Sequence, residues 1–321
     1  MTTENPLLSP KTPKIVGRKS EISAIKQAIN DKGSQRILYF VAGGGMGKTR
    51  LLEEVERIQK PVLIPPIIDL YHQSNHSPSG LRQAIVKGLG NKKFLNYNQK
   101  RLEFEEKREF GKGGAALEEM RAELDKAFIQ EYNQISNHQR IILRFDTLEL
   151  LQYEHDSVQT TCLVDDVNTV IKNWLLEVIP QLKNSVTIFA GRPRPIVEHH
   201  AIEDNQPRSV EEEFQIIFSK SDCHFEPFVL PSLDEKECKE FIQLMCQQYP
   251  EQLNPIFYSD NPPDIYPVSE GKPIRLAILV DLFRYEQPVN IRLPKEDIDK
   301  ELVERLMGLP MPIGPAVRFC Y

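Results

Sequence analysis

The chain has 321 residues, with 40 lysines and arginines against 46 aspartates and glutamates and a formal net charge of −6. At roughly 150 residues per domain this length predicts about two domains, and 40% apolar with 27% charged residues argues against global disorder. No apolar run reaches the ~20 residues that a membrane helix needs. The acidic balance disfavours nucleic acid as a partner, although it leaves room for a local basic patch.

The cysteines and the N-terminus indicate a cytoplasmic protein. Five cysteines are scattered along the chain without a Cys-x-x-Cys motif, as is usual in a reducing compartment. The first residues have neither the basic stretch nor the apolar stretch of a secretory signal. Residues 1–13 are rich in proline and small polar residues and lack apolar periodicity, so we expect a mobile tail there.

From residue 15 onward the apolar pattern predicts alternating helices and strands. Residues 21–29 have helical spacing, residues 36–41 form a continuous apolar run, and residues 51–58 return to helical spacing. Later segments predict four more strands, at 62–70, 140–145, 185–190 and 225–230. A helix is predicted at 169–182. Strands that are apolar on both faces and joined by helices indicate an α/β fold with a mostly parallel five-stranded sheet between two helical layers.

Two stretches stand outside this alternation. Residues 92–138 are charge-dense with a sparse apolar stripe and a glycine-rich break, which predicts a helical insertion within an α/β domain at 14–229. We expect either a solvated helical hairpin or an arm that docks a partner, because long insertions usually have a function. After residue 230 the strands stop, and helices over 234–248 and 273–284 predict a small helical lid domain at 230–290, with a loop at 264–267.

Residues 42–49 carry the clearest functional pattern, Ala-Gly-Gly-Gly-Met-Gly-Lys-Thr, between a predicted strand and a predicted helix. Glycines let the main chain curve closely around phosphate groups, which need several converging backbone N–H groups. Lys48 would reach the β- and γ-phosphates, and the hydroxyl of Thr49 can coordinate Mg²⁺. Ala42 stands where the general pattern has glycine, a difference of one methyl group. The pattern predicts a phosphate-binding loop (P-loop).

A P-loop needs a carboxylate at the end of a neighbouring strand to hold the metal ion. Asp146 stands where the apolar run at 140–145 stops, so its carboxylate should emerge at the carboxyl edge of the sheet. Glu149, three residues later, could orient or deprotonate the attacking water.

With these residues the chain resembles the STAND class of P-loop ATPases, signal-transducing ATPases with numerous domains that are related to the AAA+ and origin-recognition ATPases. Residues 15–22, Ile-Val-Gly-Arg-Lys-Ser-Glu-Ile, are similar to the family's short N-terminal motif, whose backbone borders the adenine. Residues 186–193 resemble its sensor strand, in which an arginine, here Arg192, senses the γ-phosphate. Residues 271–277 resemble its Gly-x-Pro motif, where a proline of the lid, here Pro273, packs near the base.

The resemblance implies a molecular switch in which ATP and ADP favour different lid positions and slow hydrolysis resets the state that controls assembly or signalling. It implies ATP or ADP and Mg²⁺ as ligands, with Thr49 and Asp146 on the metal ion. The residues expected to act in hydrolysis are Lys48, Asp146, Glu149 and Arg192. Those expected to contact the nucleotide are Val16, Gly17, Arg18, Gly43, Gly44, Gly45, Met46, Gly47, Lys48, Thr49, Arg50 and Pro273.

Departures from the family pattern keep other functions open. Lys19 replaces the commoner glutamate of the N-terminal motif, and Thr147 follows Asp146 where many members have a second acid, which leaves the rate of hydrolysis open. The alternatives are a non-hydrolysing interaction module with structural nucleotide and a DNA-loading AAA+-like ATPase, which the acidic balance disfavours. Self-association or a partner protein could use the lid or the 92–138 insertion, and no membrane contact is expected. Because relatives continue into a winged helix, we expect residues 291–321 to begin such an element and stop early.

Overall fold

The computed structural model describes residues 13–31, 35–58, 61–109, 115–152, 165–193 and 209–284, which fall into two compact units. The sheet unit comprises residues 20–41 and the described part of 52–229. The loop–helix unit comprises residues 42–51 with the described parts of 1–19 and 230–321. The expected element at 291–321, and the expected tail apart from residue 13, lie outside the described residues.

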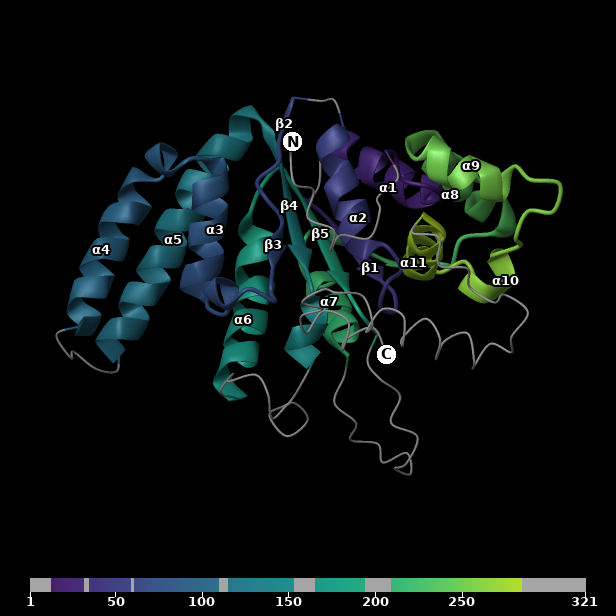
Figure 1. Ribbon diagram of the computed structural model, residues 1–321. Coiled ribbons are helices and arrows are strands. Elements are labelled where there is room, and N and C mark those ends of the chain that lie inside the picture. The colour runs from purple at the N-terminus through teal and green to yellow at the C-terminus, as the bar shows by residue number, and fades with distance from the viewer. Residues whose placement is uncertain are drawn as a thin grey trace. The chain divides into compact units, whose positions relative to one another are not determined.

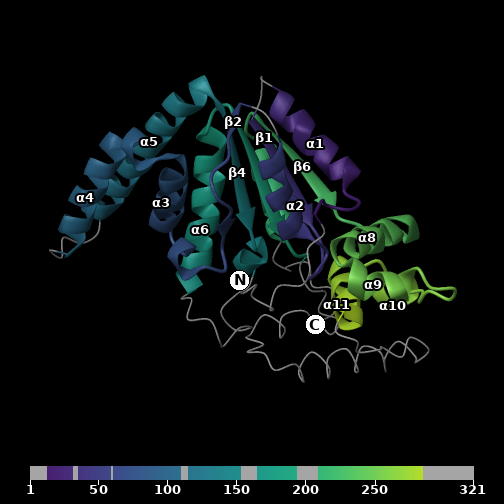
Figure 2. The ribbon, with the colours of Figure 1, turned by 45° about the horizontal axis from the view of Figure 1, so that its top comes forward.

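The sheet unit contains a six-stranded sheet in which every described strand pairing is parallel. Its order is β2-β4-β5-β1-β6, with β3 also paired to β4. Figure 1 labels β1 to β5, and Figure 2 labels β6 beside β1. This arrangement confirms the predicted α/β class. The strands are β1 (Gln35–Val41), β2 (Val62–Leu63), β3 (Ile68–Asp69), β4 (Arg140–Asp146), β5 (Ser185–Gly191) and β6 (Cys223–Val229).

The prediction of five strands is wrong, because the strand predicted over 62–70 is two short strands. Pro65 and Pro66 lie between β2 and β3, and proline has no N–H to donate to a strand ladder. β2 therefore pairs with the start of β4, whereas β3 pairs with its end, where Asp69 is in register with Asp146. Two acidic residues thus lie at neighbouring strand ends.

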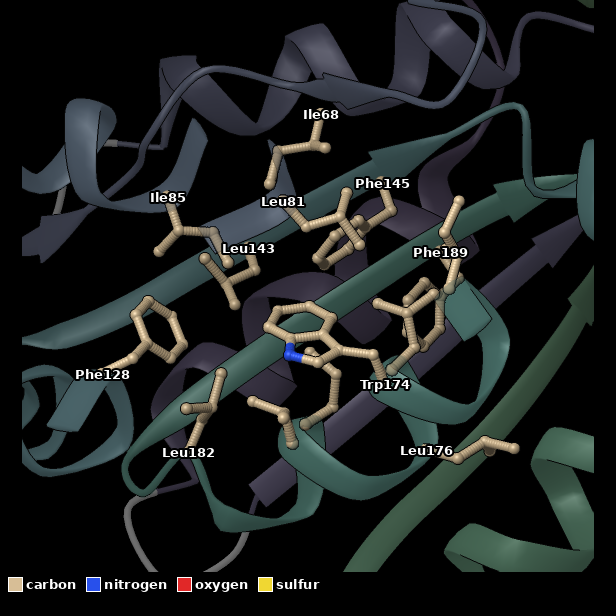
Figure 3. Packing of buried hydrophobic residues seen from close by; sticks show 14 of the residues in the cluster. Ile68, Leu81, Ile85, Phe128, Leu143, Phe145, Trp174, Leu176, Leu182 and Phe189 are labelled. Atoms are coloured by element: carbon tan, nitrogen blue, oxygen red, sulfur yellow. The ribbon is translucent and has the colours of Figure 1, made fainter. Parts of the chain in front are cut away.

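Buried side chains cover both faces of the sheet. One face shares a core with α3 (Pro78–Leu89), α5 (Ala115–His138), α6 (Asp165–Val178) and α7 (Val210–Phe218). In that core Trp174 lies near Leu143 and Phe128 (Figure 3), with 6.2 Å between the ring centroids of Trp174 and Phe128. α1 (Lys19–Asn30) is joined to the sheet by Arg140, which donates to the carbonyl of Ala28 at 3.0 Å.

The insertion predicted at 92–138 forms an arm of two helices, α4 (Leu95–Glu109) and α5, which lie side by side in both views (Figures 1 and 2). The base of the arm belongs to the core, where Arg82 of α3 pairs with Asp125 of α5 at 2.5 Å. Farther along α4, Leu102 is 54% exposed. The arm is therefore anchored rather than solvated throughout, and its role in docking a partner stays a prediction. Its fully buried aromatic residues are Phe94, Tyr97, Phe128 and Tyr132.

The helices after β6 share a core of their own in the loop–helix unit. They are α8 (Glu235–Gln248), α9 (Pro250–Phe257), α10 (Tyr266–Ser269) and α11 (Pro273–Arg284). α8 and α11 agree with the predicted helices, whereas α9 was not predicted and α10 falls in the predicted loop at 264–267. Both have proline in the first turn, a position that proline favours although it interrupts a helix elsewhere. None of the described helices is both long enough and apolar enough to cross a bilayer.

Candidate functional site

The P-loop occupies the connection between β1, which ends at Val41, and α2 (Lys48–Glu54). Gly45 has a φ of 72° and Gly47 a φ of 86°, values that residues with a β-carbon rarely adopt. The glycines are therefore required by the shape of the loop. This strand–loop–helix order agrees with the sequence prediction.

Several carbonyl oxygens of the loop accept hydrogen bonds from groups that surround them. Lys48 Nζ donates to the carbonyls of Ala42 at 2.7 Å and Gly43 at 2.9 Å. The backbone N–H of Ile274 donates to the carbonyl of Gly45 at 3.1 Å. These hydrogen bonds hold the main chain of the loop from two sides, through its own lysine and through the start of α11.

Helix α11 begins directly against the P-loop within the loop–helix unit. A β-carbon placed on Gly45 would lie 2.1 Å from Cγ2 of Ile274, so the side chain of Ile274 fills the space beside that glycine. A β-carbon on Gly47 would lie 3.9 Å from Cγ of Pro273. The segment before α11 is fixed at Gly271, whose carbonyl accepts from the N–H of Leu233 at 2.8 Å. The Gly-Lys-Pro motif therefore places the start of α11 on the loop.

The motif at 16–18 also reaches the P-loop, through the side chain of Arg18. This side chain is 5% exposed, and its Nη2 donates to the carbonyl of Met46 at 2.9 Å. Gly17 and Arg18 both have positive φ, at 66° and 63°, and Val16 is buried in the core of α8–α11. In the structure, Arg18 supports the loop through its hydrogen bond to the Met46 carbonyl. Its contact with nucleotide stays a prediction.

In the sheet unit, Asp146 is the last residue of β4 and is 6% exposed. Its Oδ1 accepts from the backbone N–H of Thr147 at 2.9 Å. Thr147 has a φ of 63°, and its hydroxyl donates to Oδ1 of Asp69 at 2.7 Å. Asp69 was not among the predicted site residues. The available indication was the same as for Asp146, an acidic residue close to the end of an apolar run.

Glu149 and Arg192, predicted to act on water and on the γ-phosphate, form an ion pair with each other. Oε1 of Glu149 lies 2.9 Å from Nε of Arg192, and its Oε2 accepts from the N–H of Arg192 at 3.2 Å. The Glu149 side chain is 11% exposed and that of Arg192 is 36% exposed. The Glu149 carboxylate therefore contacts both the guanidinium and the backbone N–H of Arg192.

Arg144, two residues before Asp146, is a buried charge that the sequence pattern did not single out. It is fully buried and donates to the carbonyls of Leu52 at 2.8 Å and Pro65 at 2.7 Å. Its Nη2 also pairs with Glu56 at 2.8 Å. These contacts join β4 to α2, to the turn that follows α2 and to the connection between β2 and β3.

The predicted site residues thus fall into two groups. Asp146, Glu149 and Arg192 lie at the ends of β4 and β5 in the sheet unit. The predicted nucleotide contacts lie in the loop–helix unit, and are Val16, Gly17, Arg18, Gly43, Gly44, Gly45, Met46, Gly47, Lys48, Thr49, Arg50 and Pro273.

The donor chemistry of Asp146 and Thr49 suits Mg²⁺, which prefers oxygen ligands. Within the described ranges, no group of three or more His, Cys, Asp or Glu side chains could hold a metal ion by itself.

Comparison with known proteins gives similarity at the level of solved structures. No protein-family model matches the chain, and no curated protein does. Domain III of the replication initiation protein DnaA of Thermotoga maritima is 16% identical, with 91% of this chain and 94% of that chain covered and a TM-score of 0.38. A DNA replication initiation factor is 14% identical over 92% of this chain and 63% of the other, with the same TM-score of 0.38. A chain of the HORMA:CdnC:Trip13 complex of E. coli MS115-1 is 12% identical over 94% and 84%, with a TM-score of 0.39.

The fold assignment rests on the strand order and pairing rather than on these similarities. A parallel sheet whose strand β1 leads through a glycine-rich loop into a helix, followed by a helical segment, defines a P-loop α/β protein.

Proposed function

We propose that the chain is an ATP-binding molecular switch of the STAND type that hydrolyses ATP slowly. The observation that supports it best is the contact between the start of α11 and the P-loop. The N–H of Ile274 donates to the carbonyl of Gly45, and the Ile274 side chain fills the space beside the same glycine. A change in the loop on nucleotide binding would therefore change the contact that positions α11.

In this proposal helices α8–α11 form the lid, and the P-loop holds the phosphates. Lys48 would leave the carbonyls of Ala42 and Gly43 to reach the β- and γ-phosphates, while Val16, Gly17 and Pro273 border the base. Thr49 and Asp146 would hold Mg²⁺, which when bound neutralises charge that develops on the phosphate oxygens. Glu149 would orient water, and Arg192 would respond to the γ-phosphate.

Slow hydrolysis is supported by the ion pair between Glu149 and Arg192. While this pair is closed, the carboxylate and the guanidinium are directed at each other rather than at water and phosphate. Hydrolysis would require the pair to open, and the γ-phosphate would compete with Glu149 for the arginine. A differential contact of a few kcal/mol between two states is sufficient to invert their populations. The switch would then pass its state to a protein partner or to a second copy through the lid or the α4–α5 arm.

The test begins with the nucleotide that accompanies the purified protein. Freshly purified chain is denatured, and the released nucleotide is identified by ion-exchange chromatography and quantified per chain. Lys48→Ala is compared with Lys26→Ala, which removes an exposed lysine of α1. We expect close to one ADP or ATP per chain in the wild type and in Lys26→Ala. Lys48→Ala should bind about 10- to 100-fold more weakly, because a charge-assisted hydrogen bond contributes about 1.5–3 kcal/mol.

A wild-type protein without released nucleotide and without measurable ATP affinity on titration would refute the proposal. Stoichiometric nucleotide that is never hydrolysed, even by protein purified with ATP and Mg²⁺, would instead indicate the interaction module. Salt-dependent binding to duplex DNA would favour the DNA-loading ATPase.

A further inference from the structure

A continuous line of hydrogen bonds connects Asp69 on β3 to Asp146 on β4. The hydroxyl of Thr147 donates to Oδ1 of Asp69 at 2.7 Å, and the backbone N–H of Thr147 donates to Oδ1 of Asp146 at 2.9 Å. One residue therefore uses its side chain to contact the first carboxylate and its main chain to contact the second. The register of β3 and β4, in which Asp69 faces Asp146, makes this possible.

Thr147 adopts a backbone conformation that its side chain disfavours. Its φ of 63° lies in the left-handed region, where a β-branched residue is a clear outlier. Such a conformation persists when surrounding contacts hold it, and it is found most often at functional sites. The hydrogen bond to Asp69 is a contact of this kind, because it fixes the threonine side chain to a neighbouring strand.

Asp69 is itself held in place by the residues that follow β3. Its Oδ1 also accepts from the N–H of Tyr71 at 2.9 Å, and its backbone carbonyl accepts from Nδ2 of Asn75 at 2.7 Å. Asp69 is thus fixed on both its side chain and its main chain. It is a suitable support for a neighbouring residue with a strained backbone.

We propose that Asp69 is a positioning residue that sets the orientation of the Asp146 carboxylate through Thr147, and thereby its affinity for Mg²⁺ bound with nucleotide. This inference rests on the proposed function. The bond from the Thr147 N–H fixes Oδ1 of Asp146, which also fixes the plane of the carboxylate and the direction of Oδ2. Residues that orient a metal ligand from outside its coordination shell typically change metal affinity by about 10- to 100-fold when they are removed.

The chemistry of threonine suits this position. Its hydroxyl supplies the side-chain donor that the Asp69 carboxylate accepts, which an ionised acid could not supply.

The test measures nucleotide affinity by calorimetric titration with ATP, with and without Mg²⁺. The titration is done at low temperature so that hydrolysis does not contribute to the measured heat. The ratio of the two affinities is the Mg²⁺ enhancement. Asp69→Ala and Thr147→Val, which lack the acceptor and the hydroxyl, should each lower the enhancement by roughly tenfold and leave the affinity without Mg²⁺ unchanged. The double variant should be no worse than either single one, because both break the same connection.

Two conservative variants and one distant variant provide matched controls. Asp69→Asn keeps an oxygen that accepts from Thr147, and Thr147→Ser keeps the hydroxyl, so both should retain most of the enhancement. Asp222→Ala removes an exposed acid just before β6, at the opposite end of the parallel sheet, and should have no effect. If Asp69→Asn lost the enhancement as fully as Asp69→Ala, the charge of Asp69 would act directly on the metal ion and the positioning role would be overturned.

Stability is measured in parallel by thermal unfolding. Thr147→Gly removes the hydroxyl but accepts a positive φ without steric cost, so it tests the connection even if Asp69→Ala fails to fold. Loss of the Mg²⁺ enhancement in a folded Thr147→Gly variant supports the proposal. A wild-type enhancement in Thr147→Gly and Thr147→Val overturns it. Absence of any ATP binding by the wild type would refute the proposed function instead, so the two failures are distinguishable.

Discussion

The P-loop is held by hydrogen bonds to its main-chain carbonyls, whereas Asp69 and Asp146, at the ends of β3 and β4, are held by hydrogen bonds to their side chains and by strand pairing. The carbonyls of Gly45 and Met46 accept from Ile274 and Arg18, which come from distant parts of the chain. Asp146 is fixed by Thr147 and by the register of β3. The hydrogen bonds to the P-loop change when α11 or the 16–18 segment moves. The position of Asp146 changes when the sheet moves.

This difference suggests a division of labour for a nucleotide switch. In the proposed switch, the region that would move is held by a few hydrogen bonds to its main-chain carbonyls. In the proposed function, the residue that would hold the metal ion is part of a buried sheet, which close packing makes resistant to movement. Each prediction below breaks or sharpens this contrast.

The largest effect is expected at Glu149, on the rigid side. Glu149→Gln should lower ATP hydrolysis by about 10²- to 10⁴-fold, the usual contribution of a general base. ATP affinity should not fall and should rise if the proposed competition is real, because a neutral glutamine no longer forms the ion pair that holds the Arg192 guanidinium. Single-turnover hydrolysis measures the rate, and Glu177→Gln on the exposed side of α6 serves as the control. Equal rates in Glu149→Gln and the wild type would remove Glu149 from the reaction.

The next effect concerns the stability of the sheet unit. Arg144→Ala leaves the carbonyls of Leu52 and Pro65 without their donor and should lower the free energy of unfolding by about 2–6 kcal/mol, because each unsatisfied buried acceptor costs about 1–3 kcal/mol. Glu56→Ala removes a partner that is 61% exposed, so it should cost at most about 1 kcal/mol. Urea unfolding compares the two variants. Equal losses would show that Arg144 acts through the ion pair rather than through the buried carbonyls.

A smaller effect is expected where α11 meets the P-loop. Gly45→Ala introduces a β-carbon 2.1 Å from Cγ2 of Ile274 at a φ of 72°, and should lower the free energy of unfolding by about 1–3 kcal/mol. Gly43→Ala is the matched control, because a β-carbon there would meet no described atom within 4 Å. Thermal unfolding without nucleotide compares them. Adding Ile274→Ala should recover part of the loss, and failure to do so would show that backbone strain alone causes it.

The sequence predicted those features that depend on short spacing. The P-loop, the end of β4 at Asp146 and the start of α11 at Pro273 each follow from a few consecutive residues, and the structure has the loop and these two boundaries where they were expected. The contacts that Asp69 and Arg144 make depend on which strands are neighbours and on where long side chains turn. The apolar pattern of one strand contains neither the neighbouring strand nor the path of a long side chain. In the sequence, Arg144 was therefore indistinguishable from a surface residue, and Asp69 was indistinguishable from a turn residue. The individual roles of the site residues stay predictions until they are measured.

The smallest effect concerns Cys238, which reports on the core beneath α11. Burial, with a further contribution from the Asp234 carboxylate, raises the pKa of Cys238 to about 11. A raised pKa keeps the thiol protonated at pH 8, and alkylation requires the thiolate. Iodoacetamide should therefore leave Cys238 unmodified in the folded protein and modify it in urea, as peptide mass spectrometry can establish. ATP should not change this protection if the loop contact exchanges while the core of α8–α11 stays closed. Gly45→Ala should also leave the protection of Cys238 unchanged. Rapid labelling of Cys238 in this variant would show that strain at the P-loop opens the core of α8–α11. The loop contact would then not be able to change independently of the helices that support it.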